Sequence, residues 1–554
     1  MTETSNHKES GNSVPDSKDQ MVTGSAWMTA GSIFSRILGA IYIIPWRVWF
    51  GTYFFLGNAL YGKGYNIYSF FLIAAIAGIP SAIAKQVAHY NAMNEYGVGF
   101  RLYKHGFVLA AITGLVSAGL LYFGAPLFDG GDPHVIPVLH SLAWAVLIIP
   151  IMSLSRGFFQ GYQQMAPSAI SQFVEQLARV LYMLGSAFVI MQVLHGSWIT
   201  AVSQSTFAAF IGALAGTLTL GWYYLKNRSN FNYLVENSNN EIVVPAKQLY
   251  QEILQQALPF IVLGAGITIF QLIDQYTFFN FMRGTGITSS VMLNNLFAMF
   301  SVNANKLIMI IVSLSSALAI TVVPLLSEAY TRNDRKDISS QLTNSVLLFE
   351  FVMIPSSLGM AAVAHPLNIM FYGTSHKELA ISILAFSAFV AIMLGLFSVT
   401  SAIMQGVSQN KRAVRYFAVG TIIKLVLQWP CIHYLGVFGP LVSTTLGFLV
   451  ANFLIIHWLN QSFGIDFPSI AKKTNGILAF SLIMCGVAYV LVKLLSRIFG
   501  MFMVVDSFWG SFVVLLFAVG IAGYVYVYLV LHTRLADTVL GDRTSRLRTM
   551  LHIK

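Results

Sequence analysis

Apolar segments long enough to cross a bilayer recur about 14 times along this chain, and no other feature restricts the fold as strongly. A helix needs about 20 mainly apolar residues to cross the hydrocarbon core. The segments do not alternate apolar and polar residues as the strands of a membrane β-barrel do. With 56% hydrophobic and 10% charged residues, the chain is predicted to be an all-α polytopic membrane protein.

Lysine and arginine gather in alternate loops between these segments. Basic residues occur at 85–104, 226–247, 332–336 and 411–415, whereas 129–132, 195–196 and 435–436 contain none. Because basic loops stay in the cytoplasm, both termini are expected there, as an even number of spans requires. The predicted location is the bacterial plasma membrane.

Short motifs recur in the same order at spacings of about 240 residues, which indicates an internal duplication. The matched pairs are Ala30-Gly31 with Ala265-Gly266, Lys63 with Lys306, Gln160-Gly161 with Gln405-Gly406, and Arg179 with Lys424. The repeat covers six segments, an even number, so both halves have the same orientation and form parallel repeats. The sequence thus predicts two six-helix lobes related by a pseudo-two-fold axis, followed by two C-terminal helices.

This duplication divides the chain into six predicted regions. In order, they are a disordered cytoplasmic tail (1–23), the first lobe (24–225), a cytoplasmic linker (226–250), the second lobe (251–460), the two additional helices (461–533) and a basic cytoplasmic tail (534–554).

Charged residues inside the apolar segments are few, and each is costly there. Arg36 lies near the middle of the first segment, where a guanidinium costs from about 2.5 to more than 10 kcal/mol. Lys306 and Lys424, like Arg36, have no opposite charge within four residues on their own helix. We therefore expect these three cations to face a wet cavity. Glu175 and Arg179 are four residues apart and can pair on one helix face, which could be purely structural.

Cations outnumber carboxylates among these residues, so the expected central cavity attracts anions. Arginine forks also match phosphate oxygens well. The candidates for contacting an anionic substrate are Arg36, Arg179, Lys424, Lys306, Lys63 and Arg283. Asp274, Glu175 and Glu350 are candidates for binding a coupling proton or cation. An acidic cavity around Asp274 and Glu350 would instead favour a multidrug or cation antiporter.

Catalytic and nucleotide-binding motifs do not support an enzyme. Residues 57–63 read GxxxxGK, but Gly64 stands where a phosphate-binding loop has Ser or Thr, and the expected topology places it outside the cell. Cys431 and Cys485 lie in apolar runs and are interpreted as buried hydrophobic residues. We expect no cofactor, no metal, no nucleic-acid partner and no ATP hydrolysis.

Several motifs resemble those of the MurJ-like lipid II flippases of the MOP exporter superfamily, and in particular their Gram-positive polysaccharide-transport branch. The motifs are Ser35-Arg36-Ile37-Leu38-Gly39, Ile79-Pro80-Ser81-Ala82-Ile83-Ala84-Lys85, Arg156-Gly157-Phe158-Phe159-Gln160-Gly161 and Met404-Gln405-Gly406. The resemblance implies a 14-helix fold around a cationic cavity, with Arg36 as the cavity arginine of the first helix. This chain differs from the Gram-negative members of the family, which have Arg and Asp at the positions of Tyr42 and Ile43.

The resemblance also implies a function. Such proteins move the undecaprenyl-pyrophosphate-linked peptidoglycan precursor, lipid II, to the outer leaflet by alternating access. The expected partners are a polyprenyl-pyrophosphate-linked saccharide, membrane lipids and cell-wall synthesis proteins. Two alternatives remain open besides the antiporter: a flippase for another lipid-linked unit of capsule or teichoic acid, and a scaffold that does not transport.

Overall fold

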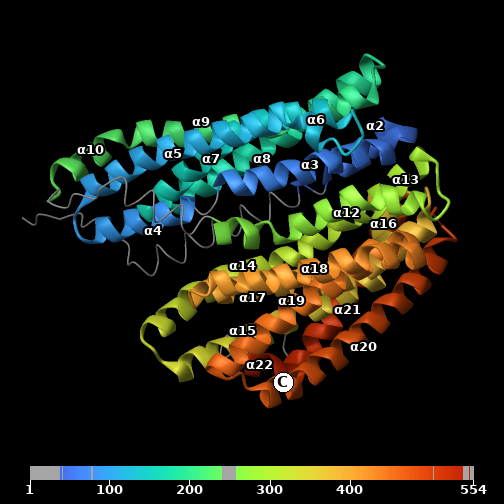
Figure 1. The fold of residues 1–554 in the computed structure, drawn as a ribbon. Coiled ribbons are helices and arrows are strands. Elements are labelled where there is room, and N and C mark those ends of the chain that lie inside the picture. The colour runs from blue at the N-terminus through green and yellow to red at the C-terminus, as the bar shows by residue number, and fades with distance from the viewer. Residues whose placement is uncertain are drawn as a thin grey trace, which may run out of the picture.

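The computed structural model describes residues 38–39, 41–76, 79–239, 258–502 and 504–540, together with 544 and 548. Every regular element within these ranges is helical, as the apolar segments predict. Figure 1 shows the helices in two groups, one in blue to green and one in yellow-green to red.

The first group contains the helices up to residue 236. They are α2 (Ile43–Phe50), η1 (Gly51–Tyr53), α3 (Phe54–Ile76), α4 (Ile79–Ala92), α5 (Tyr96–Phe123), α6 (Ala125–Phe128), α7 (Val135–Gly161), α8 (Met165–Phe188), η2 (Val189–Val193), α9 (Trp198–Lys226) and α10 (Arg228–Glu236). We call this group the first lobe.

The second lobe follows, with two further long helices after it. Its elements are α12 (Gly266–Arg283), α13 (Ser290–Phe297), η3 (Ala298–Ala304), α14 (Asn305–Thr331), α15 (Arg335–Ala362), α16 (Ala364–Tyr372), α17 (Lys377–Gly406), α18 (Asn410–Leu435), η4 (Gly436–Phe438) and α19 (Gly439–Phe463). The C-terminal elements are α20 (Phe467–Phe499), α21 (Phe508–His532) and α22 (Leu535–Leu540).

Ten helical stretches of the described chain are long and apolar enough to cross a membrane. An eleventh is added if the bent pair 258–264 and 266–283, which meet at 63°, counts as one span. One of the ten, Asn410–Phe463, contains both α18 and α19. The polytopic helical fold is therefore confirmed, whereas the number 14 stays a prediction because the first expected span is largely outside the described residues.

The two lobes meet through a limited set of elements. α3 of the first lobe contacts α12, α13 and η3 of the second, and α2 contacts α16. Figure 1 shows this junction at the right of the molecule, near the labels α2, α13 and α16. Asn58 of α3 donates a 2.8 Å hydrogen bond to Asn303 of η3, 245 residues away. The two asparagines are therefore about one repeat apart in the sequence. Equivalent residues of two repeats meet in this way near the two-fold axis that relates the repeats.

Small residues let neighbouring helices approach closely in the second lobe, as is common in membranes. A Cβ atom at Gly447 of α19 would lie 2.8 Å from the carbonyl oxygen of Gly420 of α18 and 2.8 Å from the Phe270 ring. The backbone oxygen cannot withdraw without separating α18 from α19. This contact therefore fixes the spacing of the helices that surround Lys424.

We expect Gly447→Leu to destabilise the protein by about 1–3 kcal/mol, the usual cost of overpacking. The measurement is the midpoint of thermal unfolding in detergent. Gly486→Leu on α20 is the matched control, because nothing lies within 4 Å of a Cβ there. An equal loss of stability in both variants would contradict the packing argument.

Candidate functional site

Lys306 stands in the first turn of α14 and reaches across the junction to the first lobe. Its Nζ hydrogen-bonds to the Tyr42 hydroxyl and lies 4.6 Å and 4.8 Å from the ring centroids of Tyr42 and Tyr61. No carboxylate of the described residues forms an ion pair with it. Tyrosine rings stabilise a cation only modestly compared with a buried counter-ion. Lys306 therefore has no anionic partner within the described part of the chain.

A second cationic group lies in the first lobe, where two arginines share one carboxylate. Arg156 and Arg179 each place a guanidinium nitrogen 2.8 Å from a carboxylate oxygen of Glu175. The sequence prediction that Glu175 and Arg179 pair is confirmed, and Arg156 of α7 is the additional partner. Two positive charges on one negative charge leave the group with an excess of one positive charge.

Some hydrogen-bond donors of this region have no partner among the described residues. They are Nε of Arg179 and the hydroxyl of Tyr68, both buried. Unpaired buried donors are costly, because they lose their water without gaining a replacement. An anion bound beside Arg179 would satisfy such donors.

Two stacked tyrosines connect the arginine group to Lys306. Arg179 Nη1 lies 3.5 Å from the Tyr65 hydroxyl, and the Tyr65 ring stacks on Tyr61 with centroids 5.1 Å apart. Tyr61 in turn contacts Lys306. We call the set Arg156, Glu175, Arg179, Tyr65, Tyr61, Tyr42 and Lys306 the cationic strip. It joins a guanidinium of one lobe to an ammonium of the other.

Lys424 does not belong to the cationic strip. It is fully buried within the second lobe, where its Nζ lies 2.7 Å from Asp274 Oδ1 and 2.7 Å from the Thr444 hydroxyl. Gln428 and Ser443 complete its oxygen shell at 3.3 Å and 3.4 Å. A search along its own helix could not find this counter-ion, because Asp274 comes from α12, 150 residues earlier.

Lys63 is also paired, although the sequence placed it at an outer edge. Its Nζ lies 2.7 Å from Asp132 of the first lobe and 2.9 Å from Asn294 of α13 in the second. It also lies 4.4 Å from the centroid of the Phe279 ring on α12. Lys63 and Lys306, matched in the sequence repeat, thus each contact an aromatic ring of the opposite lobe. The difference is that Lys63 has a carboxylate partner.

The remaining candidates lie apart from the cationic strip. Arg283 is exposed at the end of α12, where its Nη1 donates a hydrogen bond to Asn280 Oδ1 at 3.4 Å. Glu350 of α15 accepts a hydrogen bond from Thr474 of α20. Arg36 lies outside the described residues. The described residues contain no group of three side chains suited to hold a metal ion.

Asp132 lies in the connection between α6 and α7, where its charge secures the junction. Burial raises the pKa of Asp132, but the nearby Lys63 ammonium and the hydrogen bonds from His134 lower this pKa by a larger amount. The net shift of the pKa is therefore downward. A carboxyl group with a lowered pKa contributes stability above its unfolded pKa of about 3.8, and loses it as pH falls through the folded value. The Lys63–Asp132 pair is therefore expected to persist from pH 8 down to pH 5.

We predict that Asp132→Asn loosens the junction, because it leaves the Lys63 ammonium without its counter-ion. The reporter is Val302→Cys, which replaces a buried side chain packed against Gly62 across the junction, with Cys431 and Cys485 changed to Ala. Labelling by a maleimide reagent should rise about fivefold, equivalent to about 1 kcal/mol. Unchanged labelling of the Asp132→Asn variant would contradict this prediction. A rise in labelling at pH 5 in the reporter protein that keeps Asp132 would contradict it as well.

Known proteins resemble this chain in both sequence and fold. The polysaccharide biosynthesis protein family matches residues 21–330, and the MatE family matches residues 302–429. Lipid II flippase MurJ of Bacillus subtilis (strain 168) is 32% identical, over 95% of this chain and 97% of that protein. Stage V sporulation protein B of the same organism is 28% identical over 29% of this chain and 32% of that protein.

Among solved structures, lipid II flippase MurJ in an inward closed conformation superimposes with a TM-score of 0.58 and 16% identity. That match covers 91% of this chain and 97% of the other. An outward-facing multidrug resistance MATE family transporter of the MOP superfamily gives a TM-score of 0.59 at 16% identity, over 82% and 97% of the two chains. At such identities the likeness concerns the fold.

The fold defines the class as a multi-pass membrane protein with the architecture shared by MurJ and the MATE family transporter, which are a flippase and a transporter, not enzymes. Within that class, the identity over nearly its whole length decides the family. The chain belongs to the MurJ lipid II flippase family.

Proposed function

We propose that this protein moves a polyprenyl-pyrophosphate-linked saccharide, specifically the peptidoglycan precursor lipid II, from the inner to the outer leaflet. The observation that carries the proposal is Lys306, a cation at the lobe junction with no carboxylate partner among the described residues. The substrate diphosphate is anionic and would be bound by Lys306 from one lobe and Arg179 from the other. Arg36 stays a candidate for a third contact. The family supports the choice of substrate.

Rocking of the two lobes about their junction would alternate access to the cationic strip. The basic loops assign the ends of α4 and α10 to the cytoplasm, which puts the junction on the outer side and both termini inside. The limited set of elements at the junction would then close the outer side. Transport needs no ATP in this scheme, since moving one negative charge outward across 100 mV releases about 2.3 kcal/mol.

A flippase for another lipid-linked unit is the second candidate, supported by the match of residues 21–330 to the polysaccharide biosynthesis protein family. The diphosphate and polyprenyl groups would be the same, so the cationic strip does not discriminate between the saccharides. An antiporter for drug cations is less well supported. Asp274 is neutralised by Lys424, and Glu350 lies on a different helix pair, so neither supplies a free carboxylate at the strip.

Rescue of cells depleted of their lipid II flippase tests the substrate. Expression of the unaltered chain should restore growth and restore the amount of lipid II in the outer leaflet. Growth restored only in cells that lack a capsule or teichoic-acid flippase would favour the second candidate. Failure in both backgrounds, with the protein present at normal abundance, would overturn the proposal. Co-purification with cell-wall synthesis proteins is a separate expectation.

A further inference from the structure

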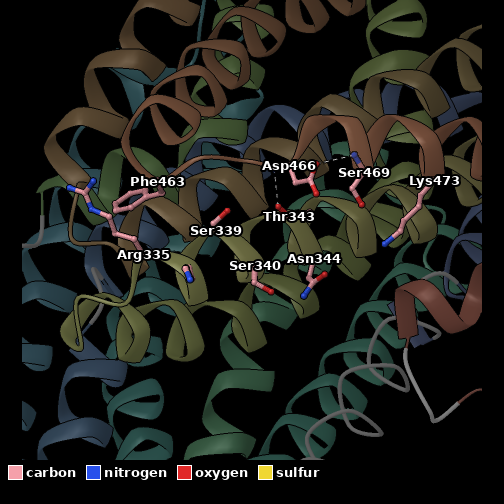
Figure 2. Close-up of a pocket in the computed structure, with 10 residues that line it drawn as sticks. Arg335, Ser339, Ser340, Thr343, Asn344, Phe463, Asp466, Ser469 and Lys473 are labelled. Atoms are coloured by element: carbon pink, nitrogen blue, oxygen red, sulfur yellow. Dashed lines mark hydrogen bonds between the residues drawn. The ribbon is translucent and has the colours of Figure 1, made fainter.

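A polar pocket of about 550 Å³ lies in the second lobe, away from the cationic strip. Figure 2 shows it between the first turns of α15 and the start of α20, with lining side chains from both helices. The basic loops assign this end to the cytoplasmic side. Phe463 is its one apolar lining residue, so the pocket suits a polar headgroup better than an acyl chain.

Hydrogen bonds between the two walls fix the shape of the pocket. The Ser339 hydroxyl donates to the Gly464 carbonyl at 2.5 Å, and the backbone N–H of Asp466 donates to the Thr343 hydroxyl at 3.2 Å. These contacts join α15 to the turn between α19 and α20. The pocket is therefore part of the packed second lobe and is not formed by a loose loop.

The charge of the pocket is positive. Its cations are Arg335, Lys336 and Lys473, whereas Asp466 is its single carboxylate. Asp466 already accepts a hydrogen bond from the N–H of Ser469 at 3.1 Å, as a helix cap. Neither Arg335 nor Lys336 forms an ion pair with any residue that the structure describes. Figure 2 shows Arg335 at one end of the pocket and Lys473 at the other, and an excess of positive charge along the pocket attracts phosphate.

Neutral donors accompany the cations. Ser340 and Asn344 stand four residues apart on α15, so both face the pocket from one side of the helix. Within the described part of the chain, neither side chain makes a hydrogen bond. α20 also exposes Leu478 and Leu482, within three turns of Lys473, where acyl chains would run alongside.

We propose that this pocket binds the phosphate of an anionic phospholipid of the inner leaflet. The phosphate would contact Lys473 of α20 and Asn344 of α15, with Lys336 adding positive charge at the other end of the pocket, and so hold α20 against the second lobe. Among the described residues, the hydrogen-bond partner of the Lys473 ammonium is the Thr538 carbonyl at 3.5 Å, a long contact that a phosphate could replace. This proposal does not depend on the transported substrate.

The test is thermal unfolding of the purified full chain in neutral detergent with added lipid. Dioleoyl phosphatidylglycerol should raise the unfolding midpoint by about 3 °C relative to dioleoyl phosphatidylcholine. The double variant Lys336→Gln/Lys473→Gln should lose this shift. The matched control is Lys411→Gln/Lys472→Gln, which removes two exposed lysines that do not line the pocket and should keep the shift.

Inorganic phosphate and glycerol phosphate form the second arm of the experiment. If they reproduce the shift and the double variant abolishes it, the pocket binds phosphate from solution and the chemistry of the site stands. Equal stabilisation of the double variant and the unaltered chain by phosphatidylglycerol overturns the proposal. Equal stabilisation by both lipids overturns it as well.

Discussion

For the lipid II flipping proposed above, Lys306→Met is expected to lower the rate by about 10- to 100-fold, because one charge-assisted contact to the diphosphate would contribute about 1.5–3 kcal/mol. The methionine keeps most of the length and apolar volume of the lysine, so packing against Tyr42 and Tyr61 should persist. The loss would therefore come from the missing charge. The measurements are rescue of flippase-depleted cells and the amount of lipid II accessible on the outer surface.

Two variants make this result specific. Lys306→Arg keeps the positive charge and should retain most of the activity. Lys411→Met removes an exposed lysine at the start of α18 and should behave like the unaltered chain. Full rescue by Lys306→Met at normal abundance would exclude Lys306 as a substrate contact. The proposal that lipid II is the substrate would still stand if the unaltered chain rescues the cells.

Lys424→Met is expected to destabilise the protein by about 3–5 kcal/mol, the cost of leaving a buried charge without its partner. The Asp274 carboxylate would keep its contact with Gln428 but lose the ammonium 2.7 Å away. The double variant Asp274→Leu/Lys424→Met should recover most of the loss, because an apolar pair of similar volume often replaces a buried ion pair at little cost. The unfolding midpoint in detergent measures both changes.

Lys493→Met is the matched control for this prediction. Lys493 is an exposed lysine of α20 that lies over the ring of Tyr489, 4.6 Å from its centroid. Its removal should alter stability by less than about 1 kcal/mol. If the double variant is no more stable than Lys424→Met alone, the Asp274–Lys424 pair has a role other than mutual neutralisation.

The sequence by itself determined the helical membrane fold and the family. A helix satisfies its own backbone hydrogen bonds, so the length and apolarity of each segment decide its structure in a bilayer without reference to the rest of the chain. The Glu175–Arg179 pair was predictable for a similar reason, because residues four apart on a helix are neighbours. The motif around Arg36 indicated the family through local residues alone.

Only the tertiary structure decided which of the candidate cations are free. Lys63 pairs with Asp132, 69 residues later, and Lys424 pairs with Asp274, 150 residues earlier, and no local sequence pattern specifies that these distant segments pack together. Lys306 occupies the position matched to Lys63, yet its neighbours among the described residues are tyrosines. The charge of a residue is a property of the sequence, but its neutralisation depends on how distant helices pack, because an ion pair acts over only a few ångströms.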